Sequence, residues 1–488
     1  MGRKSARGNG EGRWGGHRLP VYTVAAAVLL VAAVTVSARF GVPRGVWEPL
    51  DVVAWNTPGM SWAKGLLWRG EAVTVAVAPT AGDPAMSGAL YRPVGGGEYP
   101  RVLFVNGIVG RGWRNPEVEQ VARSLAGLGF VVYVPNLPAL RNDELTAASL
   151  KALGVDLRQF GASRPADKGR VSLFGVCAGA SLAILAAEQP GQSGEVRVVA
   201  AVDPYASLRD LLEAATVGRG ANARGVVEPF RMSPWAAWVI AHSVAATLAQ
   251  GAGRRAFLAT LGATPALAPG PSPLAAFGRT APPAGAGQAV DAWWRLLANR
   301  RPARFAALYE GLPQGVRGKL RALSPVDGLG GLRAPVLIAA PVTDFAYPAG
   351  EAAALAAGDR RGVQLYRSSA LDHVRPALGV LRIGGYVELW VYIARMLGAM
   401  RGGGGVAGGM GVGCGWGKQG VVPGRVFCPG GGKPQPESWA AVNPRQRKGR
   451  HHECLGGSAC GRQADLLGYS RRRGEGTHWM RCCRRWPR

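Results

Sequence analysis

Cysteine and histidine are scarce in the central part of this chain. Of the seven cysteines in 488 residues, only Cys177 lies before residue 401, and the stretch 39–400 contains two histidines, His242 and His373. A single cysteine in a body of this length excludes an internal disulfide framework there, so Cys177 is either a small buried residue or a nucleophile.

Acidic residues are also few, with 30 Asp and Glu against 58 Lys and Arg, which gives a net charge of +28. Much of this excess lies at the ends: residues 401–488 hold 16 basic and four acidic residues, and residues 1–20 hold five and one. The middle is therefore only mildly basic. No aromatic-interleaved groove or known nucleic-acid module accompanies the basic ends, so no nucleic-acid partner is expected. A hydrophobic content of 48% excludes a wholly disordered chain.

The C-terminal segment 401–488 is rich in glycine and arginine and has almost no apolar periodicity. Such a segment cannot bury enough apolar surface to offset chain entropy, so we predict a disordered tail. The cluster His451, His452, Glu453, Cys454 and Cys460 matches no tetrahedral zinc spacing, and no metal site is predicted.

The N-terminal segment combines a basic n-region, 1–20, with an uncharged apolar run, 21–38. This pattern is typical of a signal peptide or a signal anchor, and Val36-Ser37-Ala38 resembles a cleavage site. Because a basic flank stays on the cytoplasmic side, either alternative exports the body. We expect a membrane anchor with an extracytoplasmic body, or a secreted protein if the signal is cleaved. Residues 39–70 are predicted to be a linker.

The body, 71–400, alternates short apolar strand patterns with amphipathic helix patterns, which predicts a mostly parallel sheet with helices on both faces. Several helical stretches interrupt this alternation over about 206–333 and predict a cap insertion. Strands are expected at 71–79, 87–93, 101–106, 130–135, 170–174, 196–202, 334–340 and 363–367, and helices at 116–128, 143–160, 178–188, near 351 and at about 380–400.

The motif Gly175-Val-Cys177-Ala-Gly179 lies between an expected strand and an expected helix. A nucleophile on a sharp strand-to-helix turn needs small neighbours two residues away on either side, because the backbone is crowded there. The helix N-terminus lowers the pKa of a thiol at this position and stabilises developing negative charge. The sequence therefore indicates Cys177 as a nucleophile.

A thiol nucleophile needs a base, and His373 follows the expected strand 363–367, from where a loop can reach the turn. His242 lies within an apolar run of the insertion, where a packed structural role is expected. The acid that orients the base should lie between nucleophile and base in the chain. Asp344 follows the strand 334–340 and is the preferred candidate, with Asp203 after the strand 196–202 as the alternative. Asp372 is expected to be a loop residue.

An oxyanion requires two backbone N–H donors in a site poor in water. We expect one from Ala178, which follows the nucleophile, and the other from Ile108, in the glycine-rich loop after the strand 101–106.

With this set of residues the sequence resembles the α/β-hydrolase superfamily, and within it the dienelactone hydrolase group. The resemblance covers about 71–400 and rests on the elbow from Gly175 to Gly179, the PVLIAAPVTD stretch and His373. It implies an eight-stranded sheet, a Cys-Asp-His triad of Cys177, Asp344 and His373, and hydrolysis of a carboxylic ester or lactone through an acyl-thioenzyme. No cofactor is expected.

Two positions depart from that group. Its members usually carry a Glu that contacts the thiol, where this chain has Gly107, and an Arg for a substrate carboxylate, where this chain has Leu378; Arg375 is out of spacing. The expected partner is a small-molecule ester or thioester. The apolar insertion is compatible with a lipophilic substrate. Two alternatives remain: an acyl thioesterase or acyltransferase, and a non-catalytic binding protein with the same fold.

Overall fold

The structure is a computed structural model that describes residues 44–57, 72–77, 87–95, 97–163, 170–265, 270–357, 362–377, 379 and 382–402. The predicted signal segment 21–38 and residues 403–488 of the predicted tail lie outside these ranges. None of the helices within these ranges is both long enough and apolar enough to span a lipid bilayer.

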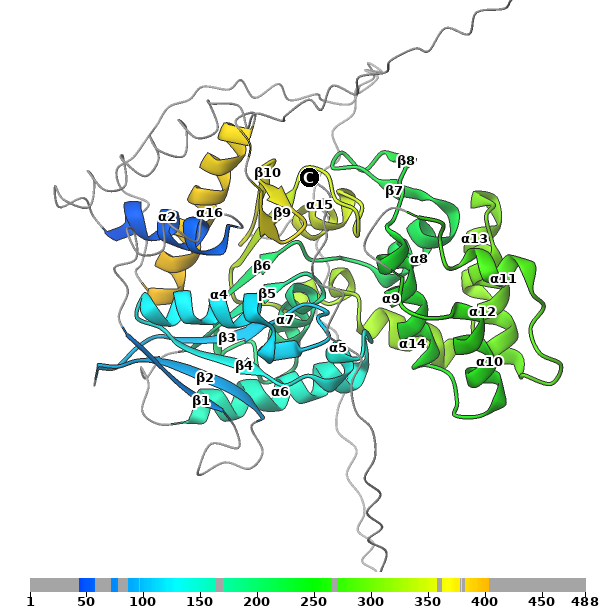
Figure 1. Ribbon diagram of the computed structural model, residues 1–488, viewed down its shortest axis with the longest axis horizontal. Helices are drawn as coiled ribbons and strands as arrows, with labels where there is room; N and C mark the ends of the chain where they lie inside the picture. Colours follow the sequence, from blue (N-terminus) through cyan, green and yellow to red (C-terminus); the bar gives the residue numbers. More distant parts are fainter. Residues whose placement is uncertain are drawn as a thin grey trace, which may run out of the picture. The chain divides into compact units, whose positions relative to one another are not determined.

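An eight-stranded sheet forms the centre of the described body, in the order β1-β2-β4-β3-β5-β6-β9-β10 (Figure 1). The two pairings at the β1 edge, β1 with β2 and β2 with β4, are antiparallel, and the remaining pairings are parallel. The strands are β1 (Val73–Val77), β2 (Gly88–Pro93), β3 (Arg101–Val105), β4 (Val131–Pro135), β5 (Val171–Val176), β6 (Val196–Val202), β9 (Val336–Pro341) and β10 (Val363–Ser368). This arrangement confirms the mostly parallel sheet predicted from the sequence.

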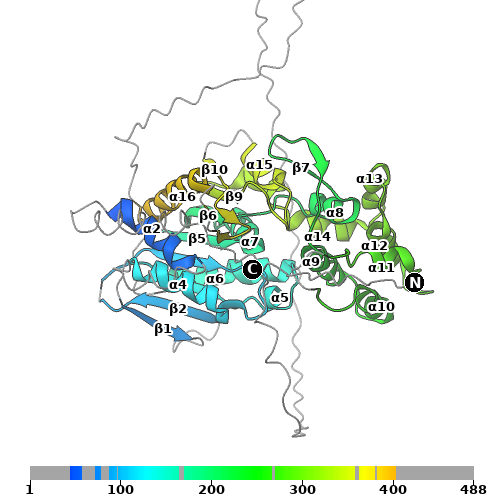
Figure 2. The same cartoon turned by 45° about the horizontal axis from the view of Figure 1, so that its top comes forward.

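The central strands are buried along their whole length, because helices cover both faces of the sheet. One face packs against α2 (Arg44–Asn56), α4 (Pro116–Gly127) and α16 (Ile383–Arg401), which share a core with Val102, Val132 and Leu337. The other packs against α6 (Ala147–Ala162) and α7 (Ala178–Glu188), and this second core continues into the insertion (Figure 2).

The insertion between β6 and β9 contains helices and one short hairpin, and it forms the cap that the sequence predicts. In Figure 1 its helices gather on the side toward which β6 runs as it ends. They are α8 (Leu208–Val217), α9 (Pro234–Ala245), α10 (Ala252–Leu261), α11 (Ala275–Arg279), α12 (Gln288–Ala298), α13 (Pro302–Glu310) and α14 (Gln314–Ala322), and the hairpin is β7 (Arg219–Ala221) with β8 (Val227–Pro229).

Two segments differ from the sequence expectations. Helix α2 lies inside the range 39–70, which the sequence assigned to a linker; Pro49 within the helix obscures the helical pattern, although Val53 packs in the core. Helix α6 begins at Ala147 rather than at 143, because Asp143 has φ 57° and Thr146 caps the first turn by accepting the N–H of Ser149. The short α5 (Pro138–Arg141) precedes it. The remaining short elements are η2 (Gly112–Arg114), η3 (Pro325–Asp327), η4 (Leu329–Gly331), α15 (Gly350–Ala357), β11 (Leu371–Asp372) and β12 (Arg375–Pro376).

Candidate active site

Cys177 lies on the sharp turn between β5 and α7, as the sequence predicts, and its backbone is in the left-handed region with φ 53°. Its backbone N–H donates to the carbonyl of Val202 at the end of β6, at 2.9 Å, which ties the turn to the neighbouring strand. A non-glycine residue in this region costs about 1–3 kcal/mol and persists where the surroundings enforce it.

The two glycines of the motif make this turn possible by letting backbone segments approach closely. A Cβ at Gly175 would lie 2.5 Å from the Cα of Ala180, and a Cβ at Gly179 would overlap the carbonyl oxygens of Val105 and Asn106 at the end of β3. Any larger side chain would therefore push α7 away from β3 or β5.

The Cys177 thiol is buried and faces a phenol that sequence reasoning missed. The Tyr347 hydroxyl lies 3.2 Å from Sγ of Cys177, and the Tyr347 ring packs edge-on against Tyr205 and His373. Tyr347 comes three residues after Asp344 on the loop that follows β9. An aromatic residue near an acid after a strand is a common pattern, so the sequence carried no specific signal for it.

His373 lies between β11 and β12 in the left-handed region, with φ 55°, and its ring is buried. Two carboxylates converge on its Nδ1: Oδ2 of Asp203 at 2.6 Å and Oδ2 of Asp344 at 3.2 Å. The Asp344 oxygen meets the geometry of a hydrogen bond with Nδ1, while the Asp203 oxygen makes the shorter contact. The structure therefore brings both candidate acids, the preferred one and its alternative, to the same histidine.

Because Nδ1 faces the carboxylates, the other ring nitrogen, Nε2, is left to interact with the Cys177 thiol. Burial alone raises the pKa of Cys177, but interaction with His373, the Tyr347 hydroxyl and the Ala178 N–H outweighs it and lowers the thiol pKa below its usual range. Burial lowers the pKa of His373, but the thiolate and the two carboxylates raise it well above its usual range. The site thus favours a thiolate–imidazolium pair.

Of the two expected oxyanion donors, Ala178 lies at the thiol and Ile108 follows a residue that adjoins it. The Ala178 N–H begins α7 and interacts with the Cys177 side chain. A Cβ at Gly107 would lie 3.0 Å from Cβ and 3.7 Å from Sγ of Cys177, so the backbone just before Ile108 adjoins the turn. Ile108 itself is buried. With no side chain at Gly107, the hydroxyl of Tyr347 is the group that contacts the thiol.

The other residues considered from the sequence lie outside this cluster. His242 is on α9, where its ring stacks on Trp238 with centroids 4.5 Å apart. Asp372 is exposed on β11. Arg375 is exposed and its guanidinium donates to Glu117 at 2.6 Å, so it is already paired on the surface. Leu378 lies outside the described residues.

One group of three ligand-type side chains occurs in the described part of the chain: Asp203, Asp344 and His373, whose ligand atoms lie within 4.8 Å of one another. With its hydrogen on Nδ1, His373 donates to Asp344 through this nitrogen, and the two carboxylates then orient the ring.

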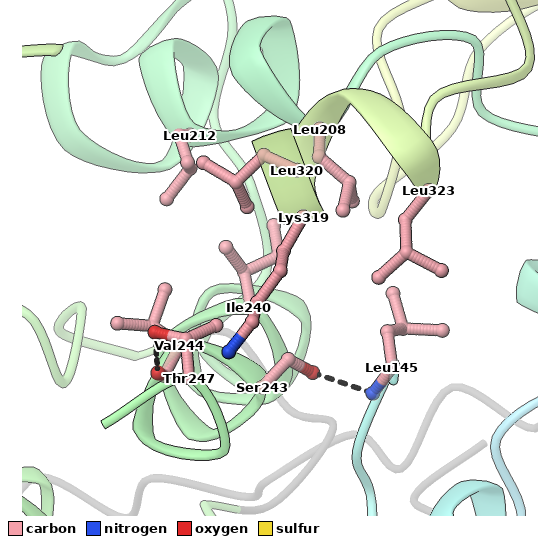
Figure 3. Close-up of a pocket in the computed structure, with 10 residues that line it drawn as sticks. All are labelled: Leu145, Leu208, Leu212, Ile240, Ser243, Val244, Thr247, Lys319, Leu320 and Leu323. Atoms are coloured by element: carbon pink, nitrogen blue, oxygen red, sulfur yellow. Dashed lines mark hydrogen bonds between the residues drawn. The ribbon is translucent and has the colours of Figure 1, made fainter. Parts of the chain in front are cut away.

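The cap contains a small apolar cavity of about 30 Å³ between α8, α9 and α14 (Figure 3). In this view Lys319 extends from α14 toward α9, while the hydroxyl of Ser243 accepts the N–H of Leu145 at 2.9 Å. One wall residue, Leu323, accepts a hydrogen bond from Tyr205, whose ring meets Tyr347. The lining is Leu145, Leu208, Leu212, Ile240, Ser243, Val244, Thr247, Lys319, Leu320 and Leu323.

No protein-family model matches the sequence, and no curated protein matches it. Among solved structures, the chain is similar to esterase B from Lactobacillus rhamnosis, with a TM-score of 0.38 and 15% identity over 78% of this chain and 97% of the other. It is also similar to acylaminoacyl peptidase from Pyrococcus horikoshii, with a TM-score of 0.36 and 13% identity over 64% of this chain and 39% of the other. A third is DcsB in complex with a substrate analogue, with a TM-score of 0.37 and 15% identity over 68% of this chain and 100% of the other.

These likenesses are too distant to carry an argument about function. The fold rests instead on the chain itself: the strand order, the antiparallel β2, the helices on both faces, the cap between β6 and β9, and a strained residue on the turn after β5. With this topology the chain has the α/β-hydrolase fold.

Proposed function

We propose that this protein is a cysteine-dependent hydrolase of carboxylic esters that works through an acyl-thioenzyme. The observation that carries the proposal is the line of contacts from Tyr347 to Cys177, from Cys177 to His373, and from His373 to the carboxylates. A strained, buried thiol at a helix N-terminus with an oriented imidazole is an arrangement suited to nucleophilic catalysis.

In the proposed mechanism the thiol proton already lies on Nε2 of His373, and the Cys177 thiolate attacks the carbonyl carbon of the ester. The N–H groups of Ala178 and Ile108 stabilise the resulting oxyanion. The imidazolium then gives its proton to the leaving alkoxide, and an acyl-thioester remains on Cys177. Water, deprotonated by His373, attacks this thioester, and the carboxylic acid leaves as the thiolate re-forms. Asp344 holds the ring with the proton on Nδ1 throughout.

The cap supports a substrate with an apolar acyl group. The cavity of Figure 3 is lined mostly by leucine, isoleucine and valine, a lining that suits an apolar acyl group. A carboxylate-bearing substrate is disfavoured because Arg375 is paired with Glu117 on the surface. We therefore propose neutral esters of apolar acyl groups, and not a lactone acid, as the substrate class.

We also propose, from the sequence pattern alone, that the 21–38 segment exports the body to the outer side of a membrane. This segment lies outside the described residues. Export is tested separately from the chemistry, by protease accessibility of the body in intact cells that express the full chain. Digestion from outside supports export, and protection until the cells are opened contradicts it.

The decisive experiment for the chemistry is turnover of p-nitrophenyl acetate, butyrate and octanoate by the wild type and by Cys177→Ala, Cys177→Ser and His373→Ala. Loss of activity in Cys177→Ala, with trapping of an acyl group on Cys177 by mass spectrometry, supports the proposal. Equal rates in all four proteins would remove it. Addition of a thiol or alcohol acceptor then measures how the acyl-thioenzyme divides between hydrolysis and transfer.

A further inference from the structure

Ionising both carboxylates at His373 would place two negative charges in one buried site. Asp203 and Asp344 are almost fully buried, with side chains 5% and 3% exposed, and their ligand oxygens lie within 4.8 Å of each other. Two negative charges at this separation, away from water, repel each other strongly, so such a pair keeps one proton between its members.

The neighbours of each carboxylate decide which member is charged. Asp344 accepts N–H groups on both oxygens: Phe345 N–H to Oδ1 at 2.6 Å and Tyr347 N–H to Oδ2 at 2.9 Å, in addition to Nδ1 of His373. Three N–H donors stabilise the ionised form of a carboxyl group. Two of these donors are backbone N–H groups of the loop after β9, which are present at any pH. Only the third, on His373, depends on the protonation of a side chain.

Asp203 has a different environment. In the described structure its side chain meets His373, with Oδ2 2.6 Å from Nδ1, and Asp344, and no backbone N–H donates to it. A carboxyl group with a carboxylate neighbour and no backbone donors is stabilised by keeping its hydrogen and donating it to that carboxylate. The backbone of Asp203 is also held in the left-handed region, with φ 53°, by its N–H bond to the Ala339 carbonyl at 2.7 Å.

We infer that Asp203 and Asp344 form a proton-sharing pair in which Asp203 is the neutral carboxylic acid and Asp344 is the anion that orients His373. This inference rests on the proposed function, and it assigns Asp203 as a positioning residue rather than a second charged acid. In this arrangement the O–H of Asp203 donates to Asp344 and fixes the carboxylate beneath the ring. The single negative charge then balances the imidazolium of His373.

Directions of the pKa shifts agree with the geometry. Burial first, and then the charge of Asp344, raises the pKa of Asp203 well above its usual range. Burial works against ionisation of Asp344, but hydrogen bonds from His373, Asp203 and the Tyr347 N–H lower its pKa below the usual range. Besides His373, the titratable side chain that faces this pair in the described residues is Tyr347, which in turn contacts Cys177 and Tyr205.

Matched asparagine variants test the assignment, because asparagine has the shape of a neutral aspartic acid and can donate one hydrogen bond from the same place. Asp203→Asn is expected to lower kcat/KM by less than about tenfold and to leave the pH profile in place. Asp344→Asn removes the charge, and by analogy with the loss of the orienting acid in serine-protease triads a fall of about 10⁴-fold is expected. The double variant gives the residual activity without either carboxyl group. Far-UV and near-UV circular dichroism checks that each variant folds.

A substrate-independent measurement separates this inference from the proposed function. In Cys177→Ala protein, the ring of His373 is titrated by NMR, with Asp203→Asn and Asp344→Asn added singly. We expect the His373 pKa to stay nearly unchanged with Asp203→Asn and to fall by about 1–3 units with Asp344→Asn. The infrared band of a protonated carboxyl group should also be lost in Asp203→Asn and not in Asp344→Asn. This comparison does not require the double variant to fold.

Two outcomes overturn the inference: equal effects of the two asparagine substitutions, or a larger effect of Asp203→Asn on the His373 pKa. An inactive wild type would remove the proposed function, yet the NMR and infrared comparisons would still decide where the proton lies.

Discussion

The hydroxyl of Tyr347 lies 3.2 Å from the sulfur of Cys177, and the two residues are 170 positions apart in the chain. Burial first, and then the neighbouring thiolate, raises the pKa of Tyr347 well above its usual range, so the phenol stays protonated and donates to Sγ. The phenol is thus placed to stabilise a negative charge on this sulfur.

Removing this donor should weaken the thiolate. Tyr347→Phe is expected to raise the Cys177 pKa and to lower kcat/KM by about 10- to 100-fold, because a hydrogen bond to a charged group contributes about 1.5–3 kcal/mol. The rate of alkylation by iodoacetamide against pH measures the thiol pKa directly. Tyr205→Phe is the matched control, since that hydroxyl binds the Leu323 carbonyl and not the thiol. An unchanged alkylation profile in Tyr347→Phe would show that the contact has no electrostatic role.

The thiolate–imidazolium pair predicts a specific pH dependence. The Cys177 pKa is lowered, so the thiolate is lost only as the pH falls through this lowered value; the His373 pKa is raised, so the imidazolium is lost as the pH rises through that value. Ultraviolet absorbance of the thiolate should therefore persist at neutral pH in the wild type. In His373→Ala it should appear only at higher pH, because the imidazolium that lowers the thiol pKa is gone. Identical titrations in the two proteins would contradict the pair.

The close approach of α7 to β3 predicts that the turn tolerates no side chain at Gly179. Gly179→Ala is expected to lower the free energy of unfolding by several kcal/mol, on the order of the largest single-residue effects, since its Cβ would overlap two backbone carbonyl oxygens. Urea denaturation measures the change. Gly194→Ala is the control, because a Cβ there meets no atom within 4 Å. Equal stabilities of the two variants would mean that the contact relaxes at little cost.

The buried carboxyl group of Glu351, outside the candidate active site, should make the stability of the protein depend on pH. Its buried Oε2 accepts the N–H groups of Ala206 and Ser207 just before α8, and burial, followed by the charge of Asp210, raises its pKa to about 8. A carboxyl group with a raised pKa contributes stability that is present below its unfolded pKa and is lost as the pH rises through about 8.

We therefore expect the free energy of unfolding to fall between about pH 5 and pH 8, and Glu351→Gln to flatten this fall, because glutamine can accept the same N–H groups without ionising. Urea titrations at several pH values measure the slope. Asp156, whose pKa burial raises to about 7, contributes in the same direction, so Asp156→Asn serves as the comparison. If Glu351→Gln leaves the slope of the free energy of unfolding against pH unchanged, another group causes the fall in stability.

Enlarging the cap cavity should change the acyl preference if substrate occupies it. Leu212→Ala is expected to shift the best p-nitrophenyl ester toward longer acyl chains, while it costs about 2–5 kcal/mol of stability. Leu153→Ala removes the same atoms from a fully buried leucine of α6 that does not line the cavity. The two variants should lose similar stability, and only the first should alter the ratio of octanoate to butyrate hydrolysis. A shift in both, or in neither, would remove the cavity from the substrate site.

Much of the framework could be predicted from local pattern. Helix α7 begins and ends where the apolar run after Cys177 predicts, and β6 coincides with a run of valines and alanines. Short-range signals of this kind survive in the fold because the buried strands and the strand-to-helix turn allow few residue types.

The relationships between loops could not be predicted in the same way. The sequence shows an acid after β6 and another after β9, but only the folded structure shows that Asp203 and Asp344 meet at one nitrogen. The role of Tyr347 likewise depends on how the loop after β9 folds back over the turn after β5. Contacts between residues more than a hundred positions apart leave no local periodicity, so pattern alone does not rank such candidates.

The hydrogen bonds from Cys177 to Val202 and from Asp203 to Ala339 tie the turn after β5 to β6, and the end of β6 to β9. The turn is therefore fully held only after β9 has been synthesised. The nucleophile is synthesised before its partners, because Tyr347 and His373 follow the whole cap. Until β9 and the loops beyond it have joined the sheet, the thiol has neither the phenol nor the imidazole that activates it. If Cys177 acts as we propose, its thiol becomes activated only when the C-terminal part of the body has folded.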